Sequence, residues 1–216
     1  FLQVKKLAGI ENWDCVLVAQ DEAPDPKVGE TLLVQGNEAS PLGTFSVTED
    51  KVQITYNPSL LKNPTQLVAT MAHELSHYLT AMTNDEPPGG WGNWEFATDL
   101  TAVFLGFGVF MANSAFNFQQ FTDFDAQGWK SNRSGYLTET ELCYALAIFC
   151  ELKHIPISEA ALHLHPNLKK LIKLNKISYI QTTSTQVQFF GFQLLEYLNK
   201  NIVDSKAQQS YRENTT

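Results

Sequence analysis

A chain of 216 residues, 44% of them hydrophobic and 18% charged, can bury a core of its own, which excludes an intrinsically disordered protein. The net charge of −8 argues against a partner with a phosphate backbone. One short basic run, LKKLIKLNK at 168–176, has lysines between apolar residues, as expected for a helix that exposes its charged face to solvent. We therefore expect no nucleic-acid partner.

The N-terminal part of the chain is rich in predicted strands. Residues 13–19, WDCVLVA, have the continuous apolar pattern of a buried strand, and a loop with Pro, Asp and Gly follows at 20–30. Residues 43–58 predict a hairpin, because two runs rich in Phe, Val, Ile and Thr flank a polar turn. We expect these strands to form a small antiparallel sheet.

The rest of the chain is predicted to be mainly helical. Apolar residues at helical spacing, from Leu67 through Leu75 to Met82, predict a helix over 66–82. A second helix is predicted over 94–118.

The apolar core of this second helix, 96–112, is short for a bilayer and carries Asp99, so we expect a buried helix and no membrane insertion. Gly106 and Gly108 would let another helix approach it closely.

A third predicted helix begins at a capping box formed by Thr138 and Glu141, and two or three further helices are expected within 157–203. Cys143 and Cys150 lie seven residues apart in a helical pattern, which places both in the core. With Cys15 they form no disulfide framework, which favours a reducing compartment, and we expect a cytoplasmic protein.

No repeat or shift of composition marks a second domain. The expected fold is therefore one α+β domain over 1–203, with a strand-rich part at 1–60, the helices of the candidate site at 65–155 and additional C-terminal helices at 156–203. Residues 204–216 are expected to be a disordered tail.

The sequence MAHELSHYL at 71–79 contains the residues best suited to chemistry. His73 and His77 lie four apart, so on a helix their rings project from the same face and can reach one ion. Glu74, one step round the helix, can reach a water bound to that ion. A hydrolytic zinc site takes three protein ligands and keeps one position open, so a further ligand is needed.

The following predicted helix offers that ligand in the sequence NWEFATDL. Glu95 can complete a site of two histidines and one glutamate. Asp99, four residues later, can accept a hydrogen bond from the far ring nitrogen of a ligand histidine, which gives this carboxylate a partner in an otherwise apolar helix. Asp85, Glu86 and Asp99 remain alternative third ligands.

The two motifs, His73-Glu74-x-x-His77 and Glu95-x-x-x-Asp99, resemble those of the gluzincins, the thermolysin-like zinc metallopeptidases. The predicted strand KVQITYN before the motif helix is similar in place to the edge strand that aligns substrates in that class. The resemblance implies a zincin-like fold around the two motif helices.

The resemblance covers about residues 50–100. Thr80 and Thr83 stand where a metzincin would have Gly and a third His, so that class is excluded. The remaining sequence, with phrases such as GYLTETELCYALAIF, resembles a bacterial family of zinc-binding proteins from which no substrate can be carried over.

The resemblance implies a zinc cofactor and a peptide or protein substrate. Glu74 would be the general base, taking the proton of a zinc-bound water and passing it to the leaving nitrogen. Sites of this class also use a donor that stabilises the oxyanion. Tyr136 and Tyr144 are the first candidates for that catalytic role, with His163 and His165 as alternatives.

Three functions remain in competition. A zinc-dependent hydrolase, specifically a metallopeptidase, leads because a purely structural site has no need of Glu74. A catalytically silent or regulatory zinc-binding protein is the alternative, favoured by the unassigned oxyanion donor. A helical scaffold without a metal rests only on chance occurrence of the motif.

Trp91 or Trp94, in the loop between the two motif helices, would face the substrate or belong to an ordinary surface loop.

Overall fold

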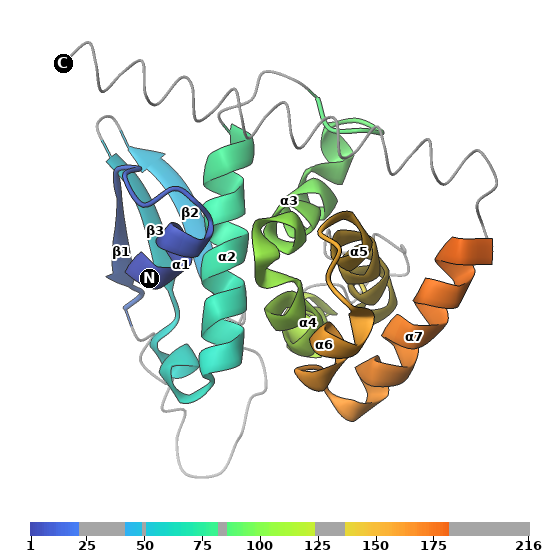
Figure 1. Ribbon diagram of the computed structural model, residues 1–216. Coiled ribbons are helices and arrows are strands. Elements are labelled where there is room, and N and C mark those ends of the chain that lie inside the picture. Colours follow the sequence, from blue (N-terminus) through green and yellow to red (C-terminus); the bar gives the residue numbers. More distant parts are fainter. Residues whose placement is uncertain (22–41, 49–50, 82–85, 124–136, 182–216) are drawn as a thin grey trace.

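The computed structural model of the protein describes residues 1–21, 42–48, 51–81, 86–123 and 137–181 (Figure 1). A small three-stranded sheet lies on one side of the central helix α2 (Pro64–Ala81), and the other long helices lie on its opposite side (Figure 1). This confirms the expected α+β class with a sheet packed on a mainly helical domain. The predicted tail at 204–216 and any helix after residue 181 lie outside the described residues.

The sheet has the strand order β1-β3-β2. The predicted hairpin is present: β2 (Gly43–Thr48) and β3 (Lys51–Tyr56) pair antiparallel. The other edge of β3 pairs in parallel with β1 (Cys15–Ala19). The sheet is therefore mixed, which corrects the expectation of a purely antiparallel one. The strand KVQITY is the central strand β3, which corrects the expectation that it takes the place of an edge strand. β1 and β3 can run in the same direction because the chain between them passes through β2, which runs the opposite way.

Strand β1 also corrects the prediction of a buried strand at 13–19. Among the described strands it lies at an edge and pairs with β3 alone, and Val16 and Val18 are 41% and 40% exposed. Leu17, between them, packs against the core. A continuous apolar run does not reveal which face of a strand is covered, because successive side chains point to opposite faces.

Helix α2 confirms the predicted helix over 66–82. Asn63 caps its start by accepting a hydrogen bond from the amide of Gln66 at 3.3 Å, and Pro64 occupies the first turn. The helix is buried on most of its surface because the sheet covers one side and helices cover the other. Its buried residues therefore include polar side chains, His73 and Glu74 among them.

The helix predicted over 94–118 is broken into α3 (Trp94–Ala102), a π-helical turn η3 (Val103–Phe107) and α4 (Gly108–Asp123). Gly106 lies in the turn with φ of 100°, a conformation that glycine adopts without strain. Gly108 has the expected packing role. A Cβ atom there would lie 2.9 Å from Cδ1 of Leu146, so glycine lets α5 (Glu139–Leu152) approach closely.

The stretch Trp91–Ala115 is long and apolar enough to cross a membrane by length and composition alone. Of an apolar segment of 18 residues within it, 56% is buried inside the protein. The core helix of a soluble protein meets the same criteria, so this is weak evidence for a membrane span. Buried contacts of Val103, Phe107 and Met111 agree with a core helix. The absence of membrane insertion stays a prediction.

The C-terminal helices continue the same core. The capping box predicted at Thr138 and Glu141 is present at the start of α5, and Cys143 and Cys150 are buried free thiols. Helices α6 (Ile157–Leu162) and α7 (Pro166–Gln181) pack on α5. One hydrophobic cluster joins all these parts, from the N-terminal helix α1 (Leu2–Leu7) to Ile172 of α7.

Candidate metal centre

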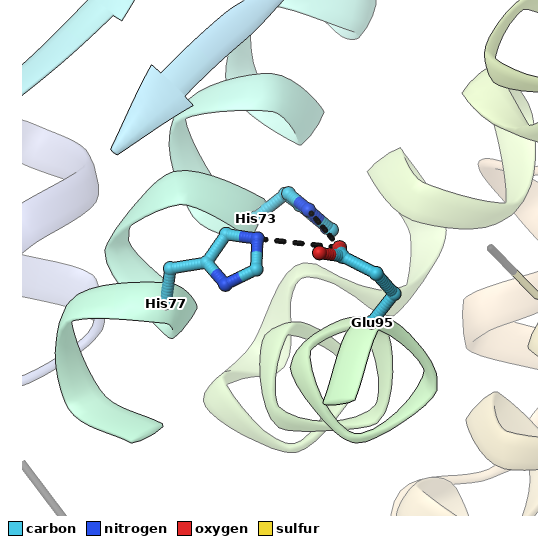
Figure 2. Close-up of side chains that lie close together, drawn as sticks. All are labelled: His73, His77 and Glu95. Atoms are coloured by element: carbon cyan, nitrogen blue, oxygen red, sulfur yellow. Dashed lines mark ion pairs between the residues drawn. The ribbon is translucent and has the colours of Figure 1, made fainter. Parts of the chain in front are cut away.

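Three predicted ligands converge where α2 meets α3. His73 and His77 project from successive turns of α2, and Glu95 lies in the first turn of α3. Figure 2 shows both rings turned toward the Glu95 carboxylate. Oε2 of Glu95 lies 3.3 Å from Nε2 of His73 and 3.3 Å from Nε2 of His77. The ligand atoms all lie within 4.8 Å of one another, so this group could hold a metal ion.

The environment of the Glu95 carboxylate also favours a metal ion at this point. Its Oε2 atom is buried and has no aligned hydrogen-bond donor among the described residues, although two imidazole nitrogens lie nearby. A buried carboxylate oxygen without a donor is costly. A cation between the three side chains would satisfy it, so the donor set fits a metal ion.

Without an ion, the cluster carries opposite charges. Burial of the His73 ring acts to lower its pKa, but the hydrogen bond to Asp99 and the nearby carboxylate of Glu95 prevail and raise the pKa of His73 to about 10. Burial acts to raise the pKa of Glu95, whereas contact with both histidines lowers the pKa to about 2. An imidazolium at His73 and a carboxylate at Glu95 therefore hold the metal-free site together.

Asp99 supports His73 from the side away from Glu95. Its Oδ1 lies 2.9 Å from Nδ1 of His73, and both side chains are buried. Its Oδ2 accepts a hydrogen bond from the amide of Leu137 at 2.8 Å. The carboxylate thus has the expected partner, a candidate ligand histidine, and in addition ties the site to the residue before the N-cap of α5.

His77 is held differently. The indole Nε1–H of Trp94 donates to its Nδ1 at 3.1 Å, and Oγ1 of Thr98 lies 3.3 Å from the same atom. The Thr98 hydroxyl also donates to the carbonyl of Trp94 at 3.0 Å. Thr98 was not among the predicted site residues, although its offset of three residues from Glu95 places it on the same face of α3.

Glu74 is buried beside the sheet. A Cβ atom at Gly43, the first residue of β2, would lie 3.0 Å from Oε1 of Glu74 and 2.6 Å from Cγ2 of Thr70. Glycine at position 43 therefore provides the space in which the Glu74 carboxylate lies. Burial raises the pKa of Glu74, and the neighbouring histidines oppose that rise.

Aromatic rings surround His77. Phe45 of β2 stacks on it with a centroid distance of 6.2 Å, and Trp94 lies at 6.4 Å. Trp91, in the 3-10 turn η2 (Trp91–Asn93), packs on Trp94 at 5.5 Å and is 54% exposed. The loop tryptophans therefore lie at the candidate site.

Two of the three alternative third ligands, Glu86 and Asp99, do not join this group. Glu86 is exposed, and its Oε1 accepts a hydrogen bond from the amide of Trp91 at 3.1 Å. Asp99 contacts Nδ1 of His73, whereas the atom of this ring that faces Glu95 is Nε2. Asp85 lies outside the described residues.

The oxyanion donor stays a prediction. Tyr136 lies outside the described residues, and Tyr144 is half-buried on α5. His163 and His165 are exposed at the connection between α6 and α7, where both backbones bond to the side chain of Asn113 on α4.

Comparisons of the chain with protein-family models, curated proteins and solved structures found no match. The residues of the site supply two imidazoles and a carboxylate around one point, with Glu74 as the next residue on the motif helix.

Proposed function

We propose that the protein is a zinc-dependent hydrolase of the gluzincin type, a metallopeptidase that acts on a peptide or protein. The convergence of His73, His77 and Glu95 on one point carries the proposal. Two histidines and one glutamate are the ligands of thermolysin-type catalytic zinc, whereas structural zinc sites are closed by four ligands, commonly with sulfur among them. All three cysteines occur as free thiols apart from this group.

A zinc ion held by these side chains would supply a water of lowered pKa and polarise a substrate carbonyl. Asp99 accepts the Nδ1–H of His73, which leaves Nε2 to face the site. A carboxylate oxygen of Glu74 takes the proton of the attacking water and returns it to the leaving nitrogen. The raised pKa of Glu74 suits both steps, because a stronger base also holds the proton until the nitrogen needs it.

The position of β2 supports a peptide as the substrate. In the described part of the chain this strand is an edge of the sheet, and its Phe45 packs on His77. An extended peptide can pair with an edge strand through main-chain hydrogen bonds. Such pairing beside β2 would bring a peptide bond close to the proposed ligands.

A zinc-binding protein without turnover is the second candidate. The unassigned oxyanion donor favours it, because a peptidase site of this type needs a group to stabilise the developing charge. Zinc binding alone does not separate the two candidates, so the decisive residue is Glu74.

The test is the substitution Glu74→Gln. The amide keeps the shape of the side chain but cannot accept the proton, so the variant should bind zinc like the wild type and lose peptide cleavage. Both proteins are assayed on a mixed peptide library after metal analysis, with Glu86→Gln as a control at an exposed glutamate. Zinc-loaded wild type that cleaves nothing would favour the silent binding protein.

A further inference from the structure

The Nδ1 atom of His77 faces one group that can only donate a hydrogen bond and one that can also accept. The indole of Trp94 donates to it at 3.1 Å, and Oγ1 of Thr98 lies 3.3 Å away. An indole N–H can only donate, so its hydrogen bond requires a lone pair on Nδ1. A hydroxyl oxygen can also accept, so Thr98 is able to bond to a protonated Nδ1.

The indole bond belongs to a ring that is not a metal ligand. When Nδ1 carries the lone pair, the neutral imidazole has its hydrogen on Nε2, the atom that faces Glu95 at 3.3 Å. A metal-ligating nitrogen must present a lone pair instead. The bond between Trp94 and His77 therefore stabilises the metal-free arrangement, in which the Nε2 atom that lies 3.3 Å from Oε2 of Glu95 carries the hydrogen.

In the ligating tautomer the hydrogen lies on Nδ1, where it meets the indole N–H, and two donors cannot bond to each other. Thr98 resolves this conflict. Its hydroxyl hydrogen goes to the carbonyl of Trp94 at 3.0 Å, so its oxygen can accept from Nδ1 of His77. Trp94 is only half-buried, so a displaced indole N–H can bond to water.

We propose that Thr98 is the positioning residue that holds His77 in its metal-binding tautomer, and that Trp94 competes with the ion for this ring and loses its hydrogen bond when the ion binds. The inference rests on the proposed metal site. It makes the two ligand histidines unequal: a carboxylate orients His73, and a hydroxyl opposed by an indole orients His77.

The test follows the indole N–H signals of the four tryptophans by ¹⁵N NMR while zinc chloride is added to the full chain freed of metal by a chelator. Trp94→Phe assigns the Trp94 signal. In the wild type this signal should move to the position of a water-bonded indole in step with zinc binding. Zinc affinity should rise several-fold in Trp94→Phe, because the phenyl ring cannot donate a competing hydrogen bond.

Variants at position 98 test the second half of the proposal. Thr98→Val should lower zinc affinity by about 10-fold or more, as loss of a partner of a ligand histidine does, and Thr98→Ser should restore it. Thr98 is fully buried, so circular dichroism checks the fold of both variants.

Two results would overturn the inference while the metal site stands: an unchanged Trp94 signal at zinc saturation, or equal zinc affinity in wild type and Thr98→Val. Weaker zinc binding by Trp94→Phe would overturn it as well. Wild type that binds no zinc would remove the proposed site and the inference together. None of these readouts uses hydrolysis, so failure of the peptidase proposal alone is recognised separately.

Discussion

The carboxylate of Asp99 joins His73 to the start of α5, with Oδ1 at 2.9 Å from Nδ1 of the histidine and Oδ2 at 2.8 Å from the amide nitrogen of Leu137. Both oxygens of this buried group are therefore used, one for the candidate metal centre and one for the fold. A single side chain thus couples the orientation of a candidate ligand to the docking of a helix that begins 40 residues further along the chain.

Replacing Asp99 should affect both functions. Asp99→Ala leaves Nδ1 of His73 and the Leu137 amide without an acceptor, which should lower the free energy of unfolding by about 1–3 kcal/mol per buried group. Zinc affinity should fall by about 10–100-fold, because the ring is no longer oriented. Denaturant unfolding and competition with a chromophoric chelator measure the two effects. Unchanged zinc affinity would show that the contact only supports the fold.

The ligand assignment predicts one zinc ion per wild-type chain. His73→Ala, His77→Ala and Glu95→Ala should each lower zinc affinity strongly, because a three-ligand site loses one of its ligands. His163→Ala is the matched control, since this histidine is exposed on the connection after α6. Metal analysis after dialysis against a weak chelator checks the prediction. Equal zinc content in His77→Ala and His163→Ala would contradict the assignment.

The sequence predicted the motif residues because spacing along a helix is a local property. His73 and His77 lie four apart, as do Glu95 and Asp99, and a helix turns each pair to one face regardless of the tertiary fold. The capping box at Thr138 was also predicted correctly, since it depends on residues three positions apart.

Other features depend on contacts between distant segments, which a single sequence does not specify. The parallel pairing of β1 with β3 and the exposure of Val16 follow from which strand occupies the centre of the sheet. The role of Gly43 appears only once β2 lies against α2. The break at Gly106 was missed because a glycine within an apolar helix serves equally for close packing or for a turn.

The metal-free protein should be most stable in mildly acidic solution. The pKa of His73 rises from 6.5 to about 10 on folding, so its contribution is complete below pH 6.5 and is lost as the pH rises toward 10. The pKa of Glu95 falls from 4.5 to about 2, so its contribution is present above pH 4.5 and is lost as the pH falls toward 2.

Urea unfolding with a chelator present, at several pH values from 5 to 9, measures this dependence. His73→Gln should flatten the alkaline loss of stability, because its side chain does not titrate. The same alkaline slope in wild type and His73→Gln would assign the loss to other groups.

Gly43→Ala should disturb the proposed catalytic base without touching a ligand. The added Cβ would lie 2.6 Å from Cγ2 of Thr70 and 3.0 Å from Oε1 of Glu74, so β2 or the carboxylate has to move. We expect a loss of about 1–3 kcal/mol in the free energy of unfolding, the usual cost of overpacking, and a lower rate of peptide cleavage at unchanged zinc content. Gly92→Ala is the matched control, because a Cβ there meets nothing within 4 Å. Full activity in folded Gly43→Ala would show that the position of Glu74 does not depend on this glycine, and equal losses in both variants would trace the effect to chain stiffness rather than to crowding.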